Sequence, residues 1–266
     1  MVTVKIAVAG KGGVGKTLIA GALAYFFAKK GYKVLAIDAD PAPNLAITLG
    51  IPSDVAEKIV PISENKSLIE EKTSTGVPGV YKLSFTVDDI VRDYSIKSPL
   101  GVNLLVMGTI RSVGGGCTCP ANALIRVLLR HLIVERDEAV VIDMEAGIEH
   151  FGRATAKHVN IMLAVADANM KALEIAKKIH KFSKDAGIEK VFLVGNKVKS
   201  EAEKELLKNF SEENKIPLLG FIPYDSSIFE ADMKGITPLL HCSISEAIGA
   251  IEKIGEKLLS FKQSFA

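Results

Sequence analysis

The stretch that decides the fold is residues 10–17, which read Gly-Lys-Gly-Gly-Val-Gly-Lys-Thr. It matches the pattern G-x-x-x-x-G-K-[ST] at every position, and that pattern is typical of loops that bind phosphate groups. An apolar run over residues 4–9 predicts a buried strand before the loop, and residues 18–30 predict a helix after it. Glycines let the backbone approach an anion closely, and the start of a helix presents free N–H groups. The stretch therefore predicts a phosphate site between a strand and a helix.

Two side chains of the loop carry specific chemistry. We expect Lys16 to reach the β- and γ-phosphates of ATP and the Thr17 hydroxyl to hold Mg²⁺. The loop residues expected to contact the nucleotide are Gly12, Gly13, Val14, Gly15, Lys16, Thr17 and Leu18. A glycine-rich turn that only begins a helix is the alternative, but a complete motif in this setting argues against it.

Length and composition exclude several classes of protein. The chain has 266 residues, of which 48% are hydrophobic and 24% charged, as in globular proteins. With Lys+Arg 33 and Asp+Glu 31 the net charge is +2, too small to indicate a nucleic-acid-binding surface. The sequence runs straight into the first strand and has no apolar stretch of about 20 residues, so we expect neither a signal peptide nor a membrane span. Three cysteines make a disulfide framework improbable and fit a reducing cytoplasm.

Strand-like and helical segments alternate along most of the chain. Strands are predicted over residues 33–37, 102–107, 138–142, 161–166, 191–194 and 218–222, and helices over 121–134, 170–186 and 201–214. Repeated β–α units predict an α/β fold: a mostly parallel, doubly wound sheet flanked by helices, as in phosphate-loop NTPases. No linker divides the chain, so residues 1–266 are expected to form one ATPase domain.

The segment over residues 46–100 is less regular. Residues 54–60 fit a short helix, residues 64–79 are polar and rich in Gly, Pro and Thr, and residues 81–87 alternate like an edge strand or a hairpin arm. We expect residues 64–79 to be a flexible surface excursion. The C-terminal segment 244–265 is amphipathic, and its polar face mixes Glu with Lys. Packing on the sheet is therefore favoured over membrane binding.

Acidic residues follow two of the predicted strands. Asp38 and Asp40 come after strand 33–37 in the sequence Asp-Ala-Asp-Pro-Ala-Pro-Asn, and Asp143 ends strand 138–142. Ligands of α/β sheets bind at the carboxyl ends of the strands. We expect Asp143 to face Mg²⁺ and the N–H of Gly147, four residues on, to follow the γ-phosphate. Simple capping of the loop is the alternative for Asp38 and Asp40.

A second lysine in the phosphate loop indicates a narrower class. Lys11 gives the form K-G-G-V-G-K-T, which resembles the deviant phosphate-loop ATPases related to MinD, ParA and the nitrogenase iron protein. The resemblance implies that Lys11 crosses a dimer interface to nucleotide held by the partner subunit, with catalytic roles for Lys11, Lys16 and Asp40. In such enzymes the aspartate before proline, here Asp40, orients the attacking water, and Asn44 lies nearby. Taken alone, Lys11 fits a solvated surface charge equally well.

The same resemblance implies residues that recognise the adenine. Asn196 and Lys197 follow strand 191–194, and Pro223, Tyr224 and Asp225 follow strand 218–222. In the family these two loops close over the base. Both short sequences also form ordinary turns, so they are less specific than the phosphate loop.

A pair of cysteines is the second feature that indicates chemistry. Cys117 and Cys119 lie one residue apart in a glycine-rich loop that ends at Pro120. Both thiols can face one soft metal ion, but two ligands are too few for a firm site, and two subunits together would supply four. Thiolates suit Zn²⁺, Ni²⁺, Cu⁺ or an iron–sulfur cluster, and these alternatives stay open on the residues alone.

Two longer stretches bring the resemblance closer to one subfamily. Residues 107–124, which contain the C-x-C pair, and residues 141–150, which read Val-Ile-Asp-Met-Glu-Ala-Gly-Ile-Glu-His, resemble the carbon monoxide dehydrogenase maturation ATPases of the CooC group. The resemblance covers essentially the whole chain and makes Glu145 a mark of the subfamily. It implies a homodimer formed on binding nucleotide or metal, nickel held by Cys117 and Cys119, and Zn²⁺ as a competitor in vitro. The implied client is carbon monoxide dehydrogenase or acetyl-CoA synthase, into whose cluster ATP hydrolysis helps insert nickel.

Two other functions compete with nickel delivery. A redox ATPase resembling the nitrogenase iron protein would share an iron–sulfur cluster, but that family uses cysteines from two separate loops and only one such loop is visible. A positioning ATPase resembling MinD or ParA would bind membrane or DNA, which the small net charge and the mixed C-terminal segment disfavour.

Overall fold

The structure is a computed structural model, and it describes residues 4–40, 44–77, 80–82, 85–108, 120–134, 139–144, 159–241 and 245–261. These residues contain an eight-stranded sheet with the strand order β3-β4-β2-β5-β1-β6-β7-β8. The strands are β1 (Lys5–Gly10), β2 (Val34–Ala39), β3 (Ile96–Lys97), β4 (Asn103–Val106), β5 (Ala139–Met144), β6 (Ile161–Ala166), β7 (Lys190–Val198) and β8 (Leu218–Pro223). Neighbouring strands are parallel, except that β3 pairs antiparallel with β4. The predicted mostly parallel sheet is confirmed.

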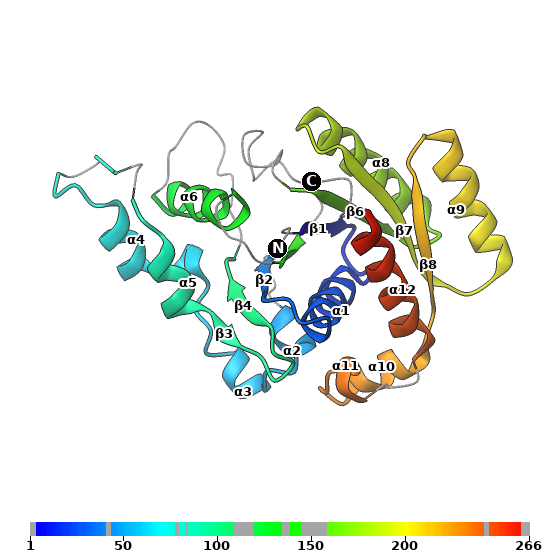
Figure 1. Cartoon of the computed structure of the whole chain (residues 1–266), viewed down its shortest axis with the longest axis horizontal. Helices are drawn as coiled ribbons and strands as arrows, with labels where there is room; N and C mark the ends of the chain where they lie inside the picture. The colour runs from blue at the N-terminus through cyan, green and yellow to red at the C-terminus, as the bar shows by residue number, and fades with distance from the viewer. Residues whose placement is uncertain are drawn as a thin grey trace.

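Helices cover both faces of this sheet (Figure 1). They are α1 (Lys16–Lys29), α2 (Leu45–Thr48), α3 (Ser53–Ala56), the 3-10 helix η1 (Ile62–Glu64), α4 (Lys66–Thr73), α5 (Asp88–Tyr94), α6 (Pro120–Val134), α8 (Met170–Asp185), α9 (Glu201–Glu213), α10 (Ser226–Met233), α11 (Pro238–His241) and α12 (Glu246–Ser260). α1 and α12 pack together on one face, and α8 and α9 pack against β6, β7 and β8 on the other. Right-handed crossovers that run in opposite directions from β1 place helices on opposite faces in this way.

The sequences of the central strands are apolar because both faces of these strands are buried. β1, β5 and β6 are buried along their whole length, because helices cover them from both sides. Each pair of neighbours runs in parallel register, for example Ile6 beside Ile161 and Val141. The carboxyl ends of β1, β2 and β5 therefore meet at one edge of the sheet.

The segment between β2 and β4 differs from its prediction. Residues 66–73, expected to be part of a flexible excursion, form α4, which packs against α6. Asn65 caps this helix by accepting a hydrogen bond from the Leu68 N–H at 3.1 Å, and the Leu68 side chain is buried. Residues 81–87, expected to form an edge strand or a hairpin arm, form no strand in their described part. An isolated antiparallel bridge joins Tyr81 to Ser74, and α5 begins at Asp88.

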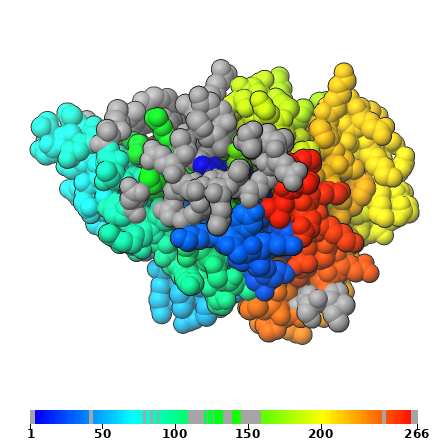
Figure 2. Space-filling view, viewed as in Figure 1, coloured from blue at the N-terminus to red at the C-terminus, as the bar shows by residue number. Residues whose placement is uncertain are grey.

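The C-terminal helix packs on the body of the protein, as predicted. α12 contacts β8 and α1, and it buries Ala247, Ile251, Ile254, Gly255 and Leu258. A side chain at Gly255 would come within 2.6 Å of the Phe26 ring of α1, so glycine permits this close approach. In the space-filling view the blue surface of α1 lies directly beside the red surface of α12 (Figure 2). Within the described residues, no helix combines the length and apolar character needed to cross a bilayer.

Candidate functional site

The phosphate loop leaves β1 in a shape that only glycine allows. A Cβ atom at Gly10 would lie 2.4 Å from the carbonyl oxygen of Val165 in β6, and Gly13 and Gly15 have φ angles of 81° and 93°. Among the described residues, no side chain caps the first turn of α1, which starts at Lys16. Its backbone N–H groups and the positive end of the helix dipole can therefore meet an anion.

Two side chains at the end of β7 form hydrogen bonds with this loop. The Asn196 side-chain amide donates a hydrogen bond to the carbonyl oxygen of Val14 at 2.6 Å, and the Lys197 ammonium donates to the carbonyl oxygen of Gly13 at 2.8 Å. A Cβ atom at Gly15 would lie 2.4 Å from the Asn196 amide nitrogen. Asn196 and Lys197 belong to β7 itself, whereas the sequence placed them in the loop after a shorter strand. In this structure both side chains shape the phosphate loop, and their contact with adenine stays a prediction.

Two buried carboxyl groups lie side by side below the loop. Asp38 of β2 and Asp143 of β5 occupy paired positions in the sheet, and both are fully buried. Asp38 accepts hydrogen bonds from the backbone N–H groups of Asp40 at 3.2 Å and Leu45 at 3.0 Å. It therefore shapes the turn after β2 and the start of α2. Burial raises the pKa of Asp38 to about 6, although these backbone hydrogen bonds oppose the rise.

Asp143 lacks such partners. Neither of its carboxylate oxygens has a hydrogen-bonding partner in the part of the chain that the structure describes. Burial raises its pKa to about 7, while the neighbouring Thr17 hydroxyl and the charge of Lys16 oppose that rise. A buried, unpartnered carboxylate next to a hydroxyl at the end of a phosphate loop is a donor set of hard oxygens, which suits Mg²⁺.

Lys16 points from the first turn of α1 toward the same edge of the sheet. Its side chain is only 6% exposed, and its ammonium lies 3.9 Å from a carboxylate oxygen of Asp40. The structure thus brings together Lys16, predicted to bind phosphate, and Asp40, predicted to orient the attacking water. Lys11 is partly exposed at the start of the loop.

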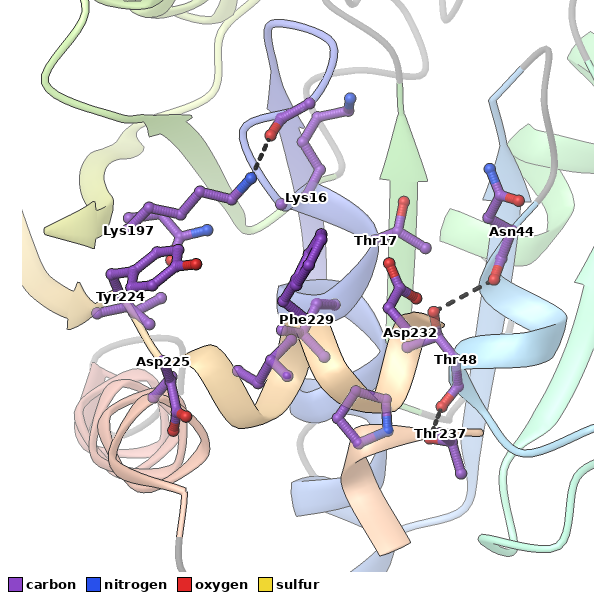
Figure 3. Close-up of a pocket in the computed structure, with 18 of the residues that line it drawn as sticks. Lys16, Thr17, Asn44, Thr48, Lys197, Tyr224, Asp225, Phe229, Asp232 and Thr237 are labelled. Atoms are coloured by element: carbon purple, nitrogen blue, oxygen red, sulfur yellow. Dashed lines mark hydrogen bonds between the residues drawn. The ribbon is translucent and has the colours of Figure 1, made fainter. Parts of the chain in front are cut away.

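A cavity of about 650 Å³ opens from the phosphate loop toward α10 and α11 (Figure 3). Most predicted site residues line it: Gly12, Gly13, Gly15, Lys16, Thr17, Leu18, Asp40, Asn44, Asn196, Lys197, Pro223, Tyr224 and Asp225. Lys11, Val14 and Asp143 do not line it. Gly147, Cys117 and Cys119 lie outside the described residues, and within the described residues no group of three or more His, Cys, Asp or Glu side chains is arranged to hold a metal ion.

Several lining residues escaped the sequence analysis. They are Ile47 and Thr48 of α2, Phe229 and Asp232 of α10, and Thr237 before α11. A signal for α10 was present: Asp225 is a good helix cap, and Phe229 and Asp232 recur at helical spacing after it. The Asp225 carboxylate does cap α10, because it accepts a hydrogen bond from the Ser227 N–H at 2.9 Å. That bond, together with those from the hydroxyls of Ser227 and Ser245, lowers the pKa of Asp225.

Comparison with known proteins identifies the family. The family described as the CobQ/CobB/MinD/ParA nucleotide binding domain matches residues 5–239. The chain belongs to this family. The CobQ/CobB/MinD/ParA domain is a nucleotide-binding ATPase, which agrees with the predicted enzyme class and with the phosphate loop and cavity described above.

Individual members of the family are similar over most of their length. The chain is 45% identical over 265 residues to an uncharacterized ATP-binding protein of Methanocaldococcus jannaschii, covering 98% of this chain and 99% of that protein. It is 41% identical over 237 residues to the carbon monoxide dehydrogenase accessory protein CooC of Rhodospirillum rubrum, covering 88% of each. The structure of MinD complexed with Mg-ADP from Pyrococcus horikoshii superposes with a TM-score of 0.67 at 19% identity, covering 98% of both chains. This last similarity confirms the fold.

Proposed function

We propose that this protein is a cytoplasmic ATPase that binds nickel and helps insert it into the active-site cluster of carbon monoxide dehydrogenase or a related nickel enzyme such as acetyl-CoA synthase. The observation that carries the proposal is the 41% identity to CooC over 88% of both chains. The C-x-C pair at residues 117 and 119 supports it, because two such pairs from two subunits would supply four thiolates to one ion.

The nucleotide of this proposal is ATP bound with Mg²⁺. Lys16 would contact the β- and γ-phosphates, and Thr17 and Asp143 would hold the cation, directly or through water. The unpartnered carboxylate oxygens of Asp143 support this role. When bound, Mg²⁺ neutralises charge on the phosphates. Asp40, next to Lys16, would orient the attacking water, and the N–H of Gly147 would follow the γ-phosphate.

Nickel is the cargo in this proposal. Cys117 and Cys119 would bind it as thiolates together with the same pair from a second subunit, so that metal binding and dimerisation support each other. A free cysteine has a pKa of about 8.5 and ligates metal only as the thiolate. Nickel affinity is therefore expected to fall as the pH drops below neutral. Zn²⁺ is expected to compete in vitro, because affinity alone seldom selects the physiological metal.

The test compares the double variant Cys117→Ala/Cys119→Ala with wild type. Wild type is expected to bind about half a nickel ion per chain and to dimerise with it, since a thiolate site usually needs about four ligands. The variant should lose both properties and still bind ATP, because the phosphate loop is a separate element. Cys242→Ala is the matched control, since it removes the third cysteine and should behave like wild type. Metal content and mass in solution, measured with and without nickel, provide the readout.

Several results would contradict the proposal. If the double variant retained a full complement of nickel, the assignment of the metal site would be wrong. A brown protein with absorbance near 400 nm, lost in the same variant, would indicate an iron–sulfur ATPase. ATP-dependent binding to lipid vesicles or DNA, unaffected by removal of the cysteines, would favour a positioning role of the MinD or ParA kind.

A further inference from the structure

The polar groups predicted to read the base are engaged elsewhere in the structure. The Asn196 amide and the Lys197 ammonium donate to carbonyl oxygens of the phosphate loop. The Asp225 carboxylate accepts from the Ser227 N–H and hydroxyl, and from the Ser245 hydroxyl at the start of α12, at 2.9, 2.6 and 2.6 Å. These residues fix the shape of the cavity, and the other predicted base contacts that line it are Pro223 and Tyr224. A further surface can add affinity for the base.

The face of α10 that lines the cavity offers such a surface. Phe229 lies four residues after the Asp225 cap, and its side chain is 59% exposed although phenylalanine usually gains free energy from burial. Figure 3 shows its ring standing up from α10 toward Lys16, with Tyr224 and Lys197 on one side and Thr17 on the other. An aromatic ring in this position is open to a flat ligand that enters the cavity.

The charges of the cavity set the direction of a bound nucleotide. Lys16, Lys197 and the first turn of α1 place positive charge at the phosphate loop, where Asp40 lies 3.9 Å from the Lys16 ammonium. Asp232, three residues after Phe229 and also lining the cavity, places a negative charge at the α10 end. The phosphates are therefore expected at the phosphate loop, which leaves the wall formed by α10 and the residues after β8 for the uncharged base.

We propose that Phe229 stacks on the base of the bound nucleotide and supplies a large part of the affinity for the nucleoside. The proposal rests on the nucleotide binding included in the proposed function, but not on nickel. Stacking of a base on an aromatic side chain contributes about 1–3 kcal/mol and tolerates different bases, because each base has a π-face. Inorganic triphosphate has no base, so it reports on the phosphate end of the cavity alone.

The test measures affinity for ADP and for inorganic triphosphate by calorimetry on the full chain. Phe229→Ala is expected to weaken the binding of ADP about 5- to 150-fold, the equivalent of about 1–3 kcal/mol, and to leave the affinity for triphosphate unchanged. Phe229→Trp should retain ADP affinity, since it keeps an aromatic ring. Met233→Ala is the matched control: Met233 is an apolar residue of α10 one turn later, 72% exposed and outside the cavity lining, so its removal should change neither affinity.

Three results would overturn the assignment. Unchanged ADP affinity in Phe229→Ala would show that the ring does not contact the base, and tighter ADP binding would show that it obstructs the site. Loss of ADP and triphosphate together, in Phe229→Leu as well as Phe229→Ala, would indicate a general structural role. Failure of the proposed function is distinguishable, because a wild type that binds ADP normally but no nickel would contradict nickel delivery and leave the role of Phe229 intact.

Discussion

At the scale of single residues, the two carboxyl groups below the phosphate loop differ in what surrounds them. Asp38 accepts two backbone hydrogen bonds, whereas Asp143 has no hydrogen-bonding partner among the described residues. Burying an ionised carboxylate without partners costs free energy, and the group responds by holding its proton to a higher pH. This cost is the reason why burial raises the pKa of Asp143 to about 7 in the ligand-free protein.

Replacing Asp143 with asparagine is expected to change how stability depends on pH. The carboxyl group has a higher pKa in the folded than in the unfolded protein, so ionisation favours unfolding as the pH rises from about 4 to about 7. Asparagine does not ionise. In the absence of ligands, the stability of Asp143→Asn relative to wild type should therefore rise between pH 5 and pH 8, by about 2–3 kcal/mol. Urea unfolding at both pH values measures the gain, and an identical difference at both would show that Asp143 is not strained by burial.

At the scale of elements, α2 is held at both ends. Its first residue, Leu45, donates its N–H to Asp38, and the carbonyl oxygen of its last residue, Thr48, accepts a hydrogen bond from the Thr237 hydroxyl beside α11. Gly50 follows with a φ of 80° and lets the chain pass closely by Thr237 and Leu240. The wall of the cavity next to α11 is thus connected to the segment that carries Asp40 and Asn44.

The variant Thr237→Val tests this connection. Valine keeps the shape of threonine but cannot donate to the Thr48 carbonyl, so we expect a loss of about 1 kcal/mol in stability. Amide hydrogens of residues 45–51 should exchange faster, because the C-terminal end of α2 loses its partner. Thr237→Ser retains the hydroxyl and serves as the control. Equal exchange rates in the valine variant and wild type would show that packing alone holds α2.

At the scale of the whole molecule, the position of Lys11 bears on assembly. Lys16 and Lys197 line the cavity of their own subunit, whereas Lys11 is partly exposed at the start of the loop and does not line it. A partly exposed cation outside the cavity of its own subunit is accessible to a second subunit. This placement is compatible with the predicted contact across a dimer interface.

We expect Lys11→Gln to impair dimerisation without impairing the binding of ADP. Affinity for ADP should stay within about threefold of wild type, since the cavity keeps its own cations. ATP-promoted dimerisation and ATP turnover should fall by more than about tenfold, because one charge-assisted contact between the subunits is lost. Calorimetry, mass in solution and phosphate release give the three quantities. Lys16→Gln is the comparison and should lose ADP affinity. If Lys11→Gln lost ADP binding outright, Lys11 would serve the phosphates of its own subunit.

Several features of this protein can be read from short stretches of its sequence. The phosphate loop at residues 10–17, the order of strands and helices from β4 to β8, and the acidic residues at the ends of β2 and β5 all follow local patterns of glycine, apolar and charged residues. Each pattern is complete within about ten residues, so no distant contact is needed to recognise it. α4 was missed because its helical character depends on packing against α6.

The construction of the cavity depends on contacts between residues that are far apart in the chain. The hydrogen bonds from Asn196 to Val14, from Lys197 to Gly13 and from Thr237 to Thr48 join residues 182, 184 and 189 positions apart. No local pattern specifies such pairs, because the order of strands in the sheet brings β7 beside β6 and thus close to the loop that follows β1. The same arrangement places α10 opposite the phosphate loop and exposes Phe229 to the cavity. Asn196 and Lys197, two of the predicted base contacts, also support the phosphate loop, since the parallel sheet brings their strand within hydrogen-bonding distance of it.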